Sequence, residues 1–266
     1  MKIRLGVNGA CGRMGQRIVH LAREAGDFQL VAAIESPGHA RLGEDIGTVC
    51  GIGPLGVLVT DQLPLHVHPE VVIDFSQPAG TRAILKTCLE RKIALVIATT
   101  GLTAQDRADI QAAAHEIPIL QAPNMSLAMN VLQHLATETA RLLRGRDFDV
   151  EIIERHHRFK KDAPSGTALH LAHSIQDIMG QTLLRHGREG QVGERHASEI
   201  GIHAVRTGDN VGEHTVIFST LGETLELTHR AHTRDCYARG ALSAARFLCN
   251  RPPGMYSMQE VLGLIT

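Results

Sequence analysis

Residues 3–22 of the chain read IRLGVNGACGRMGQRIVHLA. The first six of these residues have the pattern of a buried strand, the glycine turn Gly9–Gly15 follows, and apolar residues then recur at helical spacing. A second expected strand, residues 29–35, ends on Glu35. This order predicts a βαβ unit that binds a dinucleotide, because a glycine turn lets a pyrophosphate approach a helix N-terminus.

The glycine turn departs from the usual fingerprint at its middle position, where Cys11 replaces a glycine. A purely structural turn, and a surface acid at the end of the strand, are the alternatives. We favour dinucleotide binding because strand, turn, helix and acid occur in the expected order. Glu35 should accept hydrogen bonds from ribose hydroxyls and repel a 2′-phosphate. The pattern therefore favours NADH, with NADPH as the second choice.

Strands and helices alternate along the first half of the chain. Further strands are expected at residues 57–60, 71–75, 94–98 and 118–122, and helices at residues 79–91 and 103–114. This order favours a doubly wound, Rossmann-like parallel sheet. Ligands bind at the carboxyl ends of such strands. The candidates to line a nicotinamide path are therefore Ala98, Thr99, Thr100, Ala122, Pro123, Asn124 and Met125.

A different pattern begins at Ser126. A long amphipathic helix should run to about Gly145, and residues 181–199 are interpreted as a polar loop. From Ile200 onward apolar residues alternate with polar ones, which predicts antiparallel strands of a mixed, more open sheet in an α+β domain. A helix is expected again near the C-terminus. We therefore predict a dinucleotide-binding domain, residues 1–125 with 237–266, and a second domain, residues 126–236.

The composition argues against several classes of protein. The net charge is −1 over 266 residues, so neither a nucleic-acid partner nor a membrane partner is indicated. The five cysteines are odd in number and include no C-x-x-C pair, which favours reduced thiols and a cytoplasmic location. The N-terminus has no apolar run of signal-peptide length. The sixteen histidines include no H-E-x-x-H motif, and we predict no metal site.

The stretch EIIERHHRFKKDAPSGTA, residues 151–168, concentrates the polar chemistry of the second half. Apolar residues precede it as in a strand and follow it at helical spacing. A loop rich in cations, followed by a helix N-terminus, suits a small anionic ligand. The alternative is a solvated surface loop with a serine or threonine cap.

Five segments together carry a resemblance to a known family. They are GACGRMG at residues 9–15, ATTG at 98–101, APNMS at 122–126, the stretch 151–168, and VGEHT at 211–215. Over nearly its whole length the chain resembles the dihydrodipicolinate reductases. The resemblance implies reduction of 4-hydroxy-tetrahydrodipicolinate by NAD(P)H in diaminopimelate and lysine biosynthesis. It also implies that the second domain binds this cyclic dicarboxylate and forms a homotetramer through a mixed sheet.

The resemblance also implies roles for individual residues. His156 is expected as the general acid/base and Lys160 as a second proton donor. His157 and the amides of Gly166 and Thr167 are expected to bind substrate carboxylates. The implied cofactor contacts are Gly9, Ala10, Cys11, Gly12, Arg13, Met14, Glu35, Ala98, Thr99, Thr100, Ala122, Pro123, Asn124 and Met125.

Three positions depart from the pattern of the family. Ala98 replaces a frequent glycine, Met125 stands where phenylalanine is common, and Ser36 replaces a basic residue often found after the acid. The change at Ser36 argues against a strong preference for NADPH.

The chemistry of the residues agrees with the resemblance. A ring that has received a hydride holds excess electron density and needs a proton, and a histidine beside a dicarboxylate is a suitable donor at neutral pH. Two alternatives stay open. One is another dehydrogenase of small amino or keto acids, such as an aspartate dehydrogenase, and the other is a non-catalytic dinucleotide sensor.

Overall fold

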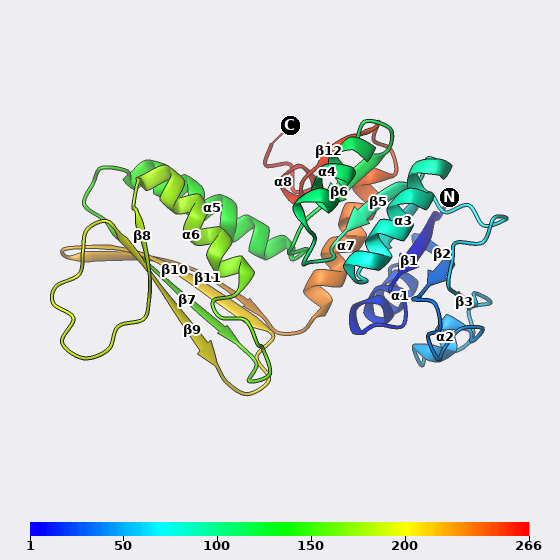
Figure 1. The fold of residues 1–266 in the computed structure, drawn as a ribbon, viewed down its shortest axis with the longest axis horizontal. Coiled ribbons are helices and arrows are strands. Elements are labelled where there is room, and N and C mark those ends of the chain that lie inside the picture. The colour runs from blue at the N-terminus through cyan, green and yellow to red at the C-terminus, as the bar shows by residue number, and fades with distance from the viewer. Residues whose placement is uncertain (266) are drawn as a thin grey trace. The chain divides into compact units, whose positions relative to one another are not determined.

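The computed structural model describes residues 1–265, which form two compact units (Figure 1). The first unit contains Met1–Leu127 and the segment from Arg234 onward, and the second contains Ala128–Thr233. The chain therefore leaves the first unit once and returns to it for its last segment.

The first unit is built on a parallel sheet of seven strands in the order β12-β6-β5-β4-β1-β2-β3. Its strands are β1 (Ile3–Asn8), β2 (Phe28–Ile34), β3 (Val59–Thr60), β4 (Val71–Asp74), β5 (Ala94–Ile97), β6 (Pro118–Gln121) and β12 (Gly254–Tyr256). The chain order reverses at β1, which pairs with β2 on one side and β4 on the other. This is the topology of a doubly wound sheet, as the alternation of elements predicts.

Helices cover both faces of this sheet. α1 and α7 pack together over one core cluster, and α3 and α4 contribute to a second. The helices are α1 (Arg13–Ala25), α2 (Ile46–Val49), α3 (Pro78–Arg91), α4 (Ala104–Ala113), α7 (Asp235–Leu248) and α8 (Met258–Val261). β4 and β5 are buried along their whole length and β1 over its last four residues, which explains why these strands appear in the sequence as apolar runs.

The second unit is a mixed sheet of five strands in the order β11-β10-β7-β9-β8. Its elements are α5 (Leu127–Leu143), β7 (Asp149–His156), α6 (Gly166–Met179), β8 (Leu183–His186), β9 (Glu199–Arg206), β10 (Gly212–Thr220) and β11 (Glu223–Ala231). α5 and α6 lie along one face of the sheet (Figure 1), where their apolar residues pack on the alternate buried positions of β7, β9 and β10.

The strands of the second unit correct two sequence predictions. The expected loop at 181–199 contains β8, whose four residues are exposed at both ends and half-buried between them, so they give no hydrophobic signal. The strand that starts near Ile200 pairs in parallel with both β7 and β8, and the antiparallel pairs of the sheet are β10 with β7 and β10 with β11. Alternation identifies a strand but not its direction. The short β12 and the one-turn helices α2 and α8 were also not predicted.

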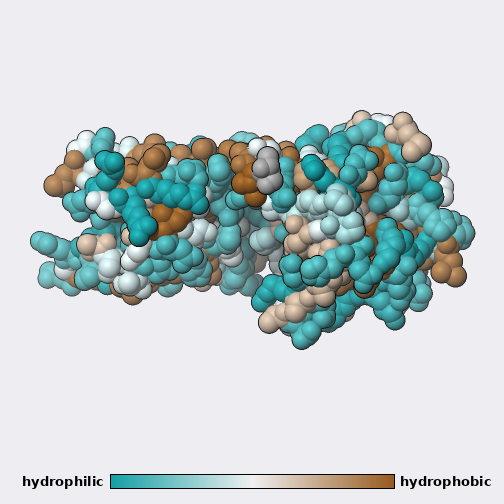
Figure 2. All heavy atoms as spheres, turned by 90° about the horizontal axis from the view of Figure 1, so that it is seen from above, coloured by the Kyte–Doolittle hydropathy of each residue, from teal (hydrophilic) through white to brown (hydrophobic). Residues whose placement is uncertain are grey.

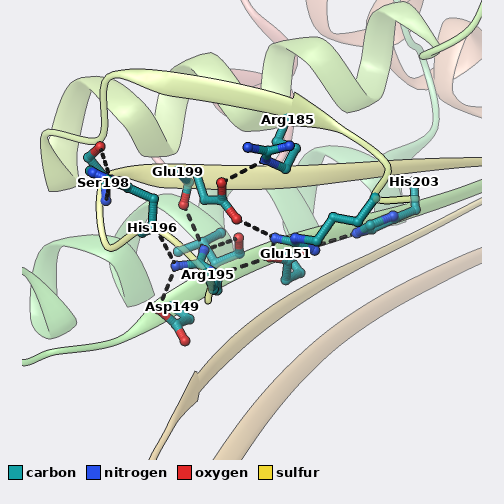
Figure 3. A network of polar contacts seen from close by, with 10 residues as sticks. Asp149, Glu151, Arg185, Arg195, His196, Ser198, Glu199 and His203 are labelled. Atoms are coloured by element: carbon teal, nitrogen blue, oxygen red, sulfur yellow. Dashed lines mark hydrogen bonds and ion pairs between the residues drawn. The ribbon is translucent and has the colours of Figure 1, made fainter. Parts of the chain in front are cut away.

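An ionic network fastens the segment after β8 to the face of the sheet opposite α5 and α6 (Figure 3). Glu151 on β7 accepts hydrogen bonds from Arg188 (2.8 Å), Arg195 (3.0 Å) and His203 (2.7 Å). The Glu151 side chain packs directly over Gly201 on β9. Only glycine fits at this position, because a Cβ there would lie 1.8 Å from a Glu151 carboxylate oxygen. Burial would raise the pKa of Glu151, but these hydrogen bonds lower it to about 2.

The surface view shows hydrophilic side chains over most of the visible face, with hydrophobic ones in small groups between them (Figure 2). Most apolar side chains instead belong to the three core clusters. In residues 1–265 we find no helix that is both long enough and apolar enough to span a membrane.

Candidate functional site

The glycine turn joins β1 to α1 and is sterically specified. Gly9 has φ +76°, and a Cβ there would lie 2.8 Å from the carbonyl oxygen of Phe75. A Cβ at Gly15 would lie 2.1 Å from the carbonyl oxygen of Gly9. Gly12 is the N-cap of α1, where no side chain caps the helix and the first turn holds no acidic residue. The N-terminus of α1 is thus a place where phosphate oxygens fit.

Glu35 follows β2 directly and lies beside this turn. Its carboxylate accepts hydrogen bonds from the backbone N–H groups of Cys11 (3.1 Å) and Ser36 (2.9 Å). The acid at the end of the second strand is therefore held against the glycine turn, as the dinucleotide fingerprint requires.

Asp74 at the end of β4 connects the strand ends on either side of it. Its side chain is fully buried and accepts hydrogen bonds from Asn8 (2.8 Å), Ser76 (2.5 Å), Thr81 (2.5 Å) and Thr99 (2.9 Å). Asn8 ends β1, and Thr99 belongs to the ATT segment after β5. Sequence reasoning assigned no role to Asp74, although an acid at the end of an apolar strand was a usable signal.

The two segments expected along a nicotinamide path follow the adjacent strands β5 and β6. The backbone N–H of Ala98 donates to Asp74 O (2.9 Å), and the N–H of Ala122 donates to Ile97 O (3.1 Å). Thr100 and Pro123 are exposed, whereas the side chain of Met125 is buried in the core. Asn124 Oδ1 accepts the N–H of Ser126 (3.0 Å) and so shapes the turn.

The second cluster lies in the second unit, at the end of β7. His156 Nδ1 lies 2.6 Å from a carboxylate oxygen of the fully buried Glu154. Arg206 on β9 binds both oxygens of Glu154 at 2.8 Å, and the N–H of Ser165 donates to it at 3.0 Å. Burial would raise the pKa of Glu154, but hydrogen bonds from His156, Arg206 and Ser165 lower it to about 2.

The loop after His156 carries the other expected site residues. Lys160 Nζ lies 2.9 Å from an oxygen of Asp162, and the N–H of Lys160 donates to His157 O (3.1 Å). Arg206 also donates to the carbonyl oxygen of Asp162 (2.6 Å), which connects this loop to β9. Asp162, for which the sequence suggested no role, therefore anchors the loop that contains Lys160.

Gly166 and Thr167 open α6, immediately after the N-cap residue Ser165. Ser165 Oγ accepts the N–H of Ala168 (3.2 Å), so the serine cap considered in the sequence is present. Gly166 is exposed, and a Cβ there would meet no atom within 4 Å. This open helix N-terminus lies one residue from the amide that binds Glu154, which brings the expected anion site and His156 into one region of the unit.

His214 on β10 completes the cluster. Its ring centroid lies 5.3 Å from that of His156, edge to face, and its Nε2 lies 3.1 Å from Ser165 Oγ. Burial, and then the charge of His156, lower the pKa of His214 to about 3. His214 is thus a neutral ring at physiological pH, and it packs against the expected acid.

Among the described residues, only Cys11, Glu35 and His39 bring three possible metal-ligand atoms within 4.8 Å of one another. Burial, and then the charge of Glu35, raise the pKa of the Cys11 thiol to about 11. A protonated thiol disfavours metal binding, because the ligand must lose its proton first. The expectation that no metal binds stays a prediction.

Comparison with known proteins decides the family. Residues 3–125 match the family model for the N-terminus of dihydrodipicolinate reductase, and residues 128–262 match the model for its C-terminus.

The chain belongs to the dihydrodipicolinate reductase family. It is 46% identical to the 4-hydroxy-tetrahydrodipicolinate reductase of Geobacter sulfurreducens, over 98% of this chain and 99% of that one. It is 44% identical to the reductase of Citrifermentans bemidjiense, with the same coverage. The dipicolinate-bound dihydrodipicolinate reductase of Paenisporosarcina sp. TG-14 superposes with a TM-score of 0.77 at 26% identity, over 98% of this chain and 99% of that one. The predicted family and the Rossmann-like fold with a second mixed sheet are thus confirmed.

Proposed function

We propose that the chain reduces 4-hydroxy-tetrahydrodipicolinate to tetrahydrodipicolinate with a nicotinamide dinucleotide, in diaminopimelate and lysine biosynthesis. The observation that carries this proposal is the His156–Glu154 pair beside the open N-terminus of α6, in a chain that matches this family over both halves. A paired histidine and an anion-binding helix start are what reduction of a cyclic dicarboxylate requires.

The first unit supplies the dinucleotide site in this proposal. Gly9 and Gly15 allow the turn to approach the pyrophosphate, which the uncapped N-terminus of α1 binds. Glu35 would accept hydrogen bonds from the ribose hydroxyls. The segments after β5 and β6 would form the part of the site that holds the nicotinamide ring. When bound, the dinucleotide supplies a hydride to ring carbon C4 of the substrate, from which water has been lost.

The second unit supplies the substrate site. The amides of Gly166 and Thr167 at the start of α6 bind one substrate carboxylate. His157 and Lys160 add charge-assisted hydrogen bonds, and Lys160 exchanges its partner Asp162 for the substrate. His156 then delivers a proton to the ring that has received the hydride. Glu154 and the substrate dianion place negative charge beside the ring that delivers this proton.

We propose that NADH is preferred to NADPH. The Glu35 carboxylate would repel a 2′-phosphate, and the nearby Arg41 already pairs with Glu44 at 2.9 Å. We expect kcat/KM with the reductase substrate to be higher for NADH. Steady-state rates with both cofactors provide the measurement. Glu35→Gln should reduce the ratio of kcat/KM for NADH to kcat/KM for NADPH. A preference for NADPH beyond about tenfold, roughly 1.4 kcal/mol, would contradict these roles of Glu35 and Ser36.

The two alternatives make different predictions. An aspartate dehydrogenase would turn over oxaloacetate with ammonia, and a dinucleotide sensor would bind NADH without oxidising it. A panel that pairs NADH with each substrate separates them, because only a reductase oxidises NADH with freshly prepared 4-hydroxy-tetrahydrodipicolinate. Family membership and the histidine cluster favour the reductase.

We also propose a cytoplasmic homotetramer assembled through the sheet of the second unit. The face opposite α5 and α6 carries the half-buried apolar residues Ile153 and Ile217 and the more exposed Val205. Within residues 1–265 the cysteines form no disulfide with one another, which agrees with a reducing compartment. Light scattering that gave the mass of a monomer would contradict the assembly.

A further inference from the structure

We propose that Glu154 is a positioning residue that fixes the tautomer and the charge of His156, and that Arg206 holds Glu154 in this role. This inference rests on the proposed role of His156 as the acid. It adds two residues, from β7 and β9, that the sequence did not place in the site.

The protonation of the pair follows from its geometry. Glu154 is fully buried, and Arg206 and the Ser165 N–H already donate to it. An ionised carboxylate only accepts hydrogen bonds, so the 2.6 Å contact requires the proton on His156 Nδ1. The nitrogen left to exchange a proton with substrate is therefore Nε2.

The surroundings of His156 contain both signs of charge. Glu154 on β7 stabilises imidazolium, whereas Arg206 on β9 opposes it. His214 on β10 packs edge to face on the ring and stays neutral. The charges of Lys160 in the loop and of His229 on β11 also lower the pKa of His214. A positive charge on either residue would likewise disfavour a positive charge on the neighbouring His156 ring. Glu154 is therefore the negative group in direct contact with the ring.

Arg206 gives the carboxylate a fixed position. It binds both oxygens of Glu154 and also donates to the carbonyl oxygen of Asp162. One arginine thus connects the partner of His156 with the loop that carries Lys160. The fixed carboxylate holds the His156 ring, in the way a buried aspartate orients the histidine of a catalytic triad.

The test begins with Glu154→Gln, which keeps the shape and removes the charge. We expect kcat to fall about 10- to 100-fold, with KM for NADH nearly unchanged. The pH at which kcat falls on the alkaline side should become lower, because a negative charge beside the ring has been removed. Arg206→Gln should raise this pH, because it removes a positive charge near the ring. The two variants should thus shift the pH profile of kcat in opposite directions. General damage to the fold would not produce shifts of opposite direction.

Glu151→Gln is the matched control. Glu151 lies three positions before Glu154 on the same strand, is also paired with arginines, and points to the opposite face of the sheet. It should destabilise the second unit without moving the pH profile. In a His156→Ala background, Glu154→Gln should cause little further loss of kcat.

Two results would overturn the inference. One is an equal loss of kcat from Glu154→Gln with and without His156. The other is an unmoved pH profile in both Glu154→Gln and Arg206→Gln. Nitrogen-15 NMR of the His156 ring in the wild-type protein tests the tautomer directly, and it depends neither on activity nor on the folding of Glu154→Gln. The neutral ring should carry its proton on Nδ1, and a proton on Nε2 would refute the pairing with Glu154. If His156→Ala instead retains turnover, the acid assignment fails, while the NMR result still decides the role of Glu154.

Discussion

His156→Ala should lower kcat by about 10²- to 10⁴-fold, the contribution of a general acid, while KM for NADH stays nearly unchanged. The physical reason is the position of the ring. His156 is buried at the end of β7, is paired with Glu154, and belongs to the unit that does not contain the glycine turn. Its loss should therefore leave the dinucleotide site intact and slow the protonation of the ring. Steady-state kinetics with NADH and the reductase substrate measure both parameters.

His173→Ala is the control for this experiment. His173 is an exposed residue of α6 with no proposed contact to substrate, and its removal should leave kcat within about twofold, as for a neutral surface change. Turnover near the wild-type value in His156→Ala would end the assignment of His156 as the acid.

Glu151→Gln should lower the stability of the second unit by about 1.5–3 kcal/mol at pH 7, the range for hydrogen bonds to charged groups. The side chain is mostly buried, and the change deprives Arg188, Arg195 and His203 of their shared anion. The pKa of Glu151 in the folded chain is about 2, below its usual value. Its stabilising effect is thus present above the usual pKa of glutamate and is lost as pH falls from about 4.5 toward 2.

Amide hydrogen exchange can follow the two units separately, which suits this test. The chain has no tryptophan, and both tyrosines, Tyr237 and Tyr256, lie in the first unit, so their fluorescence would not report on β7 and β9. The difference between wild type and Glu151→Gln should shrink between pH 7 and pH 3. A difference that stays constant would contradict the pKa shift. Glu226→Gln, at an exposed position of β11, should change stability by no more than about 0.5 kcal/mol.

Local patterns made the first unit predictable from the sequence. The glycine turn and its acid lie within one βαβ unit, and each element there is specified by residues close in the chain. The steric demands at Gly9 and Gly15 agree with the motif. β12 escaped prediction because a strand of three residues gives too short a pattern to recognise.

The candidate site of the second unit was predictable only in part. Glu154 and His156 are two residues apart on a strand, so their shared face could have been inferred. Arg206 reaches Glu154 from 52 residues away, through the parallel pairing of β7 with β9 that the sequence does not indicate. His214 likewise meets Ser165 from 49 residues away. Contacts of this kind depend on strand order and register, which a single sequence with alternating apolar residues does not determine.

Transfer of deuterium from the cofactor to the product tests the proposed reduction. The chain is supplied with NADH deuterated at both C4 positions of the nicotinamide and with freshly prepared 4-hydroxy-tetrahydrodipicolinate, and the product is analysed by mass spectrometry and NMR. We expect tetrahydrodipicolinate that carries one deuterium, bound to ring carbon C4, in an amount equal to the NADH oxidised. Oxidation of NADH without deuterium in this product, or no oxidation at all, would contradict the proposed reduction.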